Sequence, residues 1–440
     1  MYKNLSAPTS CQLELTTLCN HNCIHCYNFW RHGQGGDKNK TLTKKEIECI
    51  VGKLTKAKVF SIVITGGEPF VEKEMLSFCV DKLTDSDVWV SINSNLTILD
   101  KTLLKSFYKK GVKNILTSLL GPNEKIHDYI TQRQGSFNKI RRNIKIAIDS
   151  GMNIVVNMVV SKLNKDSVIE TAELVSDLGV KVFSITKAGC PGNCADFSEY
   201  SLSKFEFDKH IEDIYKIKKQ TNLDISVLEA YPLCGINNPV SFMKIVNRRC
   251  NAGISDLTIA SNGDVRPCSH LDINYGNLLK EELSVIWDRM IPFRRGDFLP
   301  ELCKECNLLL LCGGGCRMEA KTSSKGDISA KDPFCLLENI ENHTKNISKA
   351  FFSGGKEDLV IDSFRLKKNL RFREEDFGAV VVRNDSSQFF LNKKGFSVFQ
   401  QLNQNGKIFD IKRNNIDWRG LDPINFVSGL YKKDVVVLTE

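Results

Sequence analysis

Three cysteines near the N-terminus have a spacing that suits a metal cluster. Cys19, Cys23 and Cys26 form the pattern C-x3-C-x2-C in the segment LCNHNCIHCYN. Thiolates hold iron–sulfur clusters, and three of them can ligate three irons of a [4Fe–4S] cluster and leave the fourth iron open. An open iron can take the amine and the carboxylate of a bound molecule. A zinc site completed by His21 or His25 is the alternative, but the spacing differs from the usual zinc-binding pairs.

A second set of seven cysteines lies in the second half of the chain. The set consists of Cys250, Cys268, Cys303, Cys306, Cys312, Cys316 and Cys335. The chain has 16 cysteines in all, and close spacings in a reducing compartment indicate metal ligands rather than disulfides. Zinc at the C-x2-C pair is the alternative. Zinc ligands come in sets of four, so seven cysteines favour iron–sulfur clusters.

The elements that must position these cysteines alternate between strand and helix over the first 230 residues. Short runs rich in Ile and Val predict buried parallel strands at 12–16, 59–65, 88–93, 114–118, 153–160 and 181–186. Apolar residues at helical spacing predict helices at 43–56, 137–149, 166–178 and 203–219. Six such units predict an α/β fold, a partial (β/α)6 TIM-like barrel, with its site at the C-terminal strand ends.

The first region resembles the radical S-adenosylmethionine (SAM) superfamily. Its second signature, Gly-Gly-Glu-Pro after the second strand, is matched by Gly66, Gly67, Glu68 and Pro69. The resemblance implies that the first three cysteines hold a [4Fe–4S] cluster and that Tyr27 places a backbone group near the adenine. The glycines would approach the methionine ammonium, and Glu68 or nearby carbonyls would accept its hydrogen bonds. Reductive cleavage of SAM would give methionine and a 5′-deoxyadenosyl radical that abstracts hydrogen.

Four polar positions at or near strand ends are further candidates for contacts with SAM by this resemblance. They are Ser94, Ser118, Arg133 and Asn157. Ser94-Asn95 matches the family's Thr-Asn-Gly, although Leu96 replaces the glycine. Leu120-Gly121 stands where the family commonly has Asp-Gly, so a polar group near the substrate is missing. The alternative for each of these positions is a capped or satisfied strand end.

The second cysteine set resembles the SPASM domain, which holds auxiliary iron–sulfur clusters. The resemblance assigns Cys303, Cys306, Cys312 and Cys335 to an outer cluster, and Cys250, Cys268 and Cys316 to an inner one. The inner cluster then lacks a ligand. We expect Cys234 to supply it; otherwise one iron is open and can bind a substrate thiolate. The cofactors are therefore expected to be SAM and three [4Fe–4S] clusters.

Two other cysteines follow the sixth strand, on the expected active-site face. Cys190 and Cys194 are candidates for a catalytic radical-quenching or redox pair. The alternative is that both are small buried residues. The sequence identifies no other catalytic residue.

The C-terminal residues differ in composition from the rest of the chain and contain no cysteine. Three regions are therefore expected: a radical SAM core at 1–230, a SPASM domain at 231–345 and a small α+β module at 357–440. The last resembles the PqqD-like peptide-recognition fold, which is winged-helix-like and binds a leader peptide as an added strand. We expect the FGAVVVR strand to offer the edge. The alternative is a stabilising domain without a ligand.

Composition excludes several classes of function. No run of eighteen apolar residues and no signal peptide is present, so a membrane role is not expected and the cytoplasm is the expected location. The net charge of +9 is spread along the chain, and no Lys/Arg block with interleaved aromatics indicates nucleic acid.

Together these features predict a radical SAM oxidoreductase that matures a ribosomally synthesised and post-translationally modified peptide (RiPP). Hydrogen abstraction and oxidation through the auxiliary clusters would form a thioether or carbon–carbon crosslink. The expected partners are a precursor peptide with a leader segment and a ferredoxin or flavodoxin as electron donor. One alternative is a sulfatase-activating formylglycine-generating enzyme, which would not need the C-terminal module. The other is a non-catalytic iron–sulfur electron carrier or leader-binding scaffold.

Overall fold

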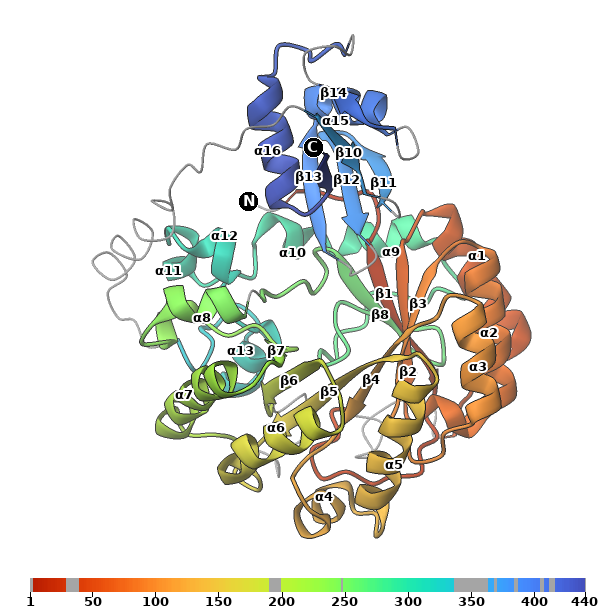
Figure 1. The fold of residues 1–440 in the computed structure, drawn as a ribbon, viewed down its shortest axis with the longest axis vertical. Coiled ribbons are helices and arrows are strands. Elements are labelled where there is room, and N and C mark those ends of the chain that lie inside the picture. Colours follow the sequence, from red (N-terminus) through yellow and green to blue (C-terminus); the bar gives the residue numbers. More distant parts are fainter. Residues whose placement is uncertain are drawn as a thin grey trace. The chain divides into compact units, whose positions relative to one another are not determined.

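The computed structural model divides into two compact units, residues 1–353 and 354–440 (Figure 1). It describes residues 3–28, 39–189, 199–246, 248–335, 363–367, 370–383, 387–403, 407–410 and 416–439. Cys190 and Cys194 lie outside these ranges. Within the described part of the chain, no helix combines the length and the apolar character needed to cross a bilayer.

A nine-stranded sheet forms the centre of the first unit. The six predicted strands are present as β1 (Ser10–Thr16), β2 (Ser61–Gly66), β3 (Trp89–Asn93), β4 (Asn114–Ser118), β5 (Asn153–Val160) and β6 (Val182–Lys187). They lie side by side in chain order and every neighbouring pair is parallel. The prediction of a partial (β/α)6 TIM-like barrel is confirmed, because this sheet curls without closing on itself (Figure 1).

Helices cover the outside of the curled sheet (Figure 1). They are α1 (Lys44–Lys56), α2 (Lys73–Asp85), α3 (Lys101–Lys109), α4 (Glu124–Thr131), α5 (Ser136–Asp149), α6 (Val168–Asp177) and α7 (Lys204–Gln220). In β5 the alternate residues Ile154, Val156, Met158 and Val160 are all buried, as expected of a face packed on helices. Asn157 and Val159 therefore face the interior of the barrel.

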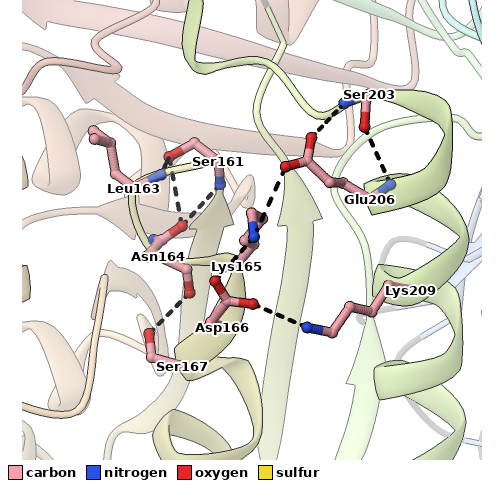
Figure 2. Close-up of polar contacts among 9 residues, drawn as sticks. All are labelled: Ser161, Leu163, Asn164, Lys165, Asp166, Ser167, Ser203, Glu206 and Lys209. Atoms are coloured by element: carbon pink, nitrogen blue, oxygen red, sulfur yellow. Dashed lines mark hydrogen bonds and ion pairs between the residues drawn. The ribbon is translucent and has the colours of Figure 1, made fainter.

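The loop after β5 is fixed to the start of α7 at the C-terminal end of the barrel strands (Figure 2). Asn164 accepts a hydrogen bond from the N–H of Ser161 at 2.8 Å and donates to the Leu120 and Val159 carbonyls, both at 2.9 Å. Lys209 of α7 pairs with Asp166 at 2.9 Å (Figure 2). Asn164 thus satisfies three backbone groups and connects the loops that follow two neighbouring strands.

The segment after the barrel contributes further strands to the same sheet. They are β7 (Asp224–Ser226) beside β6, β8 (Asp256–Ile259) beside β1, and β9 (Val265–Arg266) beside β8. The remaining helices are short: α8 (Pro239–Ile245), α9 (Leu283–Arg289), α10 (Ile291–Arg295), α11 (Glu301–Lys304), α12 (Leu309–Cys312) and α13 (Arg317–Ser323). Since β8 satisfies backbone groups at the β1 edge and β9 pairs with β8, the sheet crosses the boundary expected at residue 230.

The second unit is an α+β structure with its own apolar core. Its strands are β10 (Ser363–Leu366), β11 (Leu370–Glu375), β12 (Gly378–Arg383), β13 (Gln388–Asn392), β14 (Phe409–Asp410) and β15 (Val436–Thr439), with helices α15 (Lys393–Leu402) and α16 (Pro423–Lys432). They form two sheets in the orders β11-β12-β13 and β14-β10-β15. The FGAVVVR segment is β12, the central strand, so the expectation that it offers an edge is wrong. A run of buried, uncharged residues suits a strand paired on both sides, and the edges are β11 and β13.

Candidate metal centres and active site

The loop that carries the first three cysteines follows β1 at the C-terminal end of the barrel strands. The N–H groups of Asn22 and Ile24 donate to the carbonyls of Thr131 and Ile130 at the end of α4, at 3.2 and 2.9 Å. Ile24 and Val159 of β5 pack against the same small apolar cluster. The barrel therefore holds the cysteine loop against its interior.

The predicted glycine turn after β2 packs directly against the start of this loop. Gly66 has φ of +125°, and a Cβ at Gly67 would lie 2.0 Å from the carbonyl oxygen of Leu18. The N–H groups of Gly67 and Glu68 donate to the carbonyls of Thr16 and Leu18, both at 2.7 Å. Only glycine allows this approach, so the glycines are required by the cysteine loop itself.

The carboxylate of Glu68 is fully buried and makes its bonds within the protein. Oε1 accepts from the N–H of Phe70 at 3.0 Å and the hydroxyl of Ser94 at 2.8 Å, and Oε2 accepts from the N–H of Asn95 at 2.7 Å. Burial raises the pKa of Glu68 to about 7. Glu68 and Ser94, both expected to contact SAM, instead connect the turn that begins at Pro69 to the end of β3.

Side chains beneath the cysteine loop form a polar network that sequence reasoning missed. Asn20 donates to the Thr97 hydroxyl and accepts from the amide of Asn95, both at 2.8 Å. His21 Nε2 lies 3.1 Å from the same hydroxyl, so His21 has a structural partner. Leu96 has φ of +57°, the conformation for which the family's glycine is suited. Only its place inside the C-x3-C-x2-C motif could have indicated Asn20.

The three other residues expected to contact SAM do not all lie together. Ser118 and Asn157 are paired in register across β4 and β5, and the hydroxyl of Thr186 donates to Asn157 Oδ1 at 3.1 Å. Both face the barrel interior near the cysteine loop. Arg133 is exposed just beyond α4, whose last carbonyls hold that loop. The structure therefore brings Ser118 and Asn157 together, whereas Arg133 stays at the rim.

Tyr27 connects the first cysteine loop to the second cysteine set. Its ring packs edge-on against His270, with ring centroids 4.5 Å apart, and the N–H of His270 donates to the sulfur of Cys268 at 3.4 Å. The next residue, Asn28, donates to the carbonyl of Gly66 at 2.9 Å. Sequence reasoning predicted a role for Tyr27 but not this contact.

A buried ion pair joins the same two regions. Glu14 of β1 pairs with Arg266 of β9, two residues before Cys268, and the side chains are 1% and 3% exposed. Burial raises the pKa of Glu14 to about 6, and the charge of Arg266 partly offsets this. No local pattern signals a pair 252 residues apart in the sequence.

Five cysteines line one cavity in the second set. They are Cys234, Cys303, Cys306, Cys312 and Cys335. Four of them are the predicted outer ligands. The fifth, Cys234, has its sulfur 3.0 Å from that of Cys335. This position contradicts the expectation that Cys234 completes the inner set, because the turn that carries it is packed against Phe334.

The thiol of Cys250 lies close enough to the other two members of the inner set to affect their pKa values. Burial raises the pKa of Cys268 to about 11 and that of Cys316 well above its ordinary value, and the neighbouring Cys250 thiol raises both further. In the described ranges, no three His, Cys, Asp or Glu side chains converge on a position for a single metal ion. Thiols that surround a cavity fit a multinuclear cluster better than a mononuclear zinc site.

A buried charge cluster links β6 to the second cysteine set. Nζ of Lys187 donates to Oε1 of Glu229 and Oε1 of Glu319, both at 2.7 Å, and the lysine side chain is 1% exposed. Burial alone would lower the pKa of Lys187, but Glu229, Glu319 and Asp332 together raise it well above its ordinary value. Asp332 also accepts from the N–H of Cys316 at 2.8 Å. This cluster therefore positions an inner-set cysteine.

Comparison with known proteins gives two family matches. The radical SAM superfamily matches residues 13–175, and the SPASM iron–sulfur cluster-binding domain matches residues 250–307. The chain is 23% identical to an AdoMet-dependent heme synthase of Methanosarcina barkeri, over 75% of this chain and 97% of that protein. It is 26% identical to the antilisterial bacteriocin subtilosin biosynthesis protein AlbA of Bacillus subtilis, over 72% and 69%.

One solved structure with the same fold is that of Streptococcus suis SuiB bound to the precursor peptide SuiA. The TM-score is 0.60 at 18% identity, and the match covers 76% of each chain. At this identity the likeness shows the fold alone.

Proposed function

Because the chain is a radical SAM enzyme that carries a SPASM domain, we propose that it matures a ribosomally synthesised peptide by oxidative crosslinking. The observation that carries the proposal is the placement of the cysteines. One set lies at the mouth of the barrel, and two further sets lie in the segment that follows, joined to the first by Tyr27 and by the Glu14–Arg266 pair. Such an arrangement suits an oxidation in which electrons leave the barrel through auxiliary clusters.

The proposed ligands follow from these sets. Cys19, Cys23 and Cys26 would hold the SAM-binding cluster, the outer cavity a second cluster, and Cys250, Cys268 and Cys316 a third. When bound, SAM and its cluster supply a 5′-deoxyadenosyl radical for hydrogen abstraction. Full anaerobic reconstitution should give about 12 iron atoms per chain. A count near 4 would contradict the auxiliary assignment.

The chain's own residues orient SAM and keep water from the site. Tyr27 follows the cysteine loop, and Ser118 with Asn157 offers hydrogen-bonding groups on the interior face of β4 and β5. Ile24 and Val159 cover the interior with apolar surface. Cys190 and Cys194 follow β6 in the sequence, and we propose them as candidates for the redox or radical-quenching step.

A precursor peptide is the proposed substrate, and its leader would bind the C-terminal unit as a PqqD-like module. The proteins that support this include AlbA, a bacteriocin biosynthesis protein, and SuiB, which was solved with a precursor peptide. The strands β11 and β13 each have one side free of a strand neighbour within the described β11-β12-β13 sheet. Such edges accept an added peptide strand through main-chain hydrogen bonds. A cytoplasmic ferredoxin or flavodoxin would supply the electron.

Anaerobic co-expression with a candidate precursor, followed by tandem mass spectrometry, tests the function. We expect a mass loss of about 2 Da per crosslink, because each crosslink removes two hydrogens. The purified enzyme should release 5′-deoxyadenosine from SAM under reduction. SAM cleavage without any change in a panel of precursors would argue against a peptide substrate.

Heme synthesis is a second candidate, because the match to the Methanosarcina barkeri enzyme spans 97% of that protein. A quarter of the present chain lies outside that match, and a leader-binding unit would have no task in heme synthesis. Incubation with a tetrapyrrole precursor, followed by absorption spectroscopy, distinguishes the two. Heme formation with no peptide modification would establish this alternative.

A further inference from the structure

The turn that carries Cys234 is built to reach the segment that carries Cys335. It is the short helix η5 (Leu233–Gly235), and a Cβ at Gly235 would lie 2.0 Å from the carbonyl oxygen of Phe334. Only glycine allows the two backbones to come so close. The approach leaves the sulfurs of Cys234 and Cys335 3.0 Å apart.

Both segments are anchored to the same helix, α7. Lys204 donates to the carbonyl of Gly235 at 2.8 Å, and the ring of Phe207 packs against that of Phe334 with centroids 4.5 Å apart. The turn also reaches a further member of the outer set, because the N–H of Leu233 donates to the sulfur of Cys312 at 3.4 Å. Cys234 is therefore part of the outer site, and these contacts fix its position there.

The outer site holds one thiol more than a cluster needs. A [4Fe–4S] cluster takes four thiolates, one on each iron, whereas five cysteines line this cavity. Two thiolates 3.0 Å apart would repel each other, and the cluster keeps thiolates on different irons well apart. Cys234 and Cys335 therefore lie where they compete for the same iron.

We propose that Cys234 is an exchangeable ligand of the outer cluster, able to replace Cys335 at one iron. The proposal rests on the outer cluster of the proposed function. It goes further in assigning to one iron two alternative cysteines, 101 residues apart in the chain. At any time one sulfur is the ligand and the other remains a protonated thiol, so exchange moves one proton and leaves the number of electrons unchanged.

The test is an iron count with electron paramagnetic resonance, which requires no peptide. The full-length chain with Cys19, Cys23 and Cys26 replaced by alanine serves as the background, so that only auxiliary clusters contribute. It should bind about 8 irons after anaerobic reconstitution. Adding Cys335→Ala should keep about 8 irons, with altered g-values of the reduced cluster, and adding Cys234→Ala should also keep about 8. Adding both leaves three outer thiolates and one open iron, so the g-values should differ from those of either single variant.

Cys306→Ala is the matched control, because its sulfur accepts from the N–H of Leu308 at 3.4 Å and does not share the close Cys234–Cys335 contact. That variant leaves one iron open with no second thiol in close contact, so it should show the g-values of an open-iron cluster, as the double variant does. Cys335→Ser is the second variant if the alanine variant fails to fold by circular dichroism. An open-iron signal like that of Cys306→Ala in folded Cys335→Ala or Cys335→Ser would overturn the exchange, as would a double variant with the same g-values as Cys335→Ala. If the background protein bound no iron, the assignment of auxiliary clusters to the second cysteine set would be wrong.

Discussion

The N-terminal cysteine loop and the outer cysteine cavity hold their thiols in different ways. The loop is one continuous segment, and its residues Asn20, Asn22 and Ile24 are hydrogen-bonded to the end of β3 and the end of α4. The cavity collects five thiols from separate segments, and the helices beside it, α11 and α12, have four residues each. The barrel therefore preorganises the first site, whereas the proposed outer cluster would itself supply stability that these short helices lack.

Removing one ligand from the loop gives the largest expected effect. Cys23→Ala should abolish 5′-deoxyadenosine production, because Cys19 and Cys26 would each hold an iron of their own and neither could replace the missing ligand, while about 8 of the 12 irons remain. Cys306→Ala should retain some SAM cleavage but lose the peptide product. Chromatography of the nucleoside and mass spectrometry of the peptide measure both. If both variants cleaved SAM like the parent, the assignment of SAM cleavage to the N-terminal loop would be wrong.

Removing the unit that belongs to neither site should affect only peptide binding. Deletion of residues 357–440 should weaken leader binding on the order of 100-fold, because strand addition and its effective concentration are lost. Uncoupled SAM cleavage should continue. Fluorescence anisotropy of a labelled leader measures the affinity. Equal affinity of the intact and truncated chains would show that the unit only stabilises the protein.

The connection between the barrel and the second region can be tested with a buried and an exposed lysine. Lys187→Met should lower the free energy of unfolding by about 3–5 kcal/mol, because Glu229 and Glu319 would remain buried without their partner. Lys56→Met removes an exposed pair with Glu282 and should cost about 0–1 kcal/mol. Urea unfolding of the reconstituted proteins measures both. Similar losses of unfolding free energy in the two variants would mean that burial does not make the Lys187 contacts more important than the Lys56 contact.

The smallest effect concerns pH and the support of the cysteine loop. The pKa of Glu68 is about 7 in the folded protein against an ordinary 4.5, so the folded state holds this proton more tightly. Protonated Glu68 therefore stabilises the folded state, and this stabilisation is fully present below pH 4.5. It falls by up to roughly 3 kcal/mol as the pH rises to 7. Glu68→Gln should flatten this fall in urea unfolding across that range. Glu282→Gln, at an exposed position, is the control, and parallel curves for parent and Glu68→Gln would refute the assignment.

Much of the barrel could be predicted because its signals are local. Runs of Ile and Val gave all six strands, and the predicted 114–118 and 153–160 agree with β4 and β5 as observed. The predicted strand FGAVVVR was also found, but its place in the sheet was not, because pairing on both sides depends on β11 and β13. Likewise, the residues 256–259 gave no sign that they would extend the barrel sheet beside β1.

The sequence by itself determined the inventory of the chemistry: three thiols in one loop, seven in a later segment, and a glycine turn after the second strand. These features lie within short stretches of sequence, so the spacing of their residues is enough to indicate the chemistry. Only the tertiary structure decided which groups share a site. It placed Cys234 beside Cys335, Glu14 beside Arg266 and Lys187 between two glutamates. Such contacts join segments far apart in the chain, and they form only because packing of the barrel, α7 and the short helices brings those segments together.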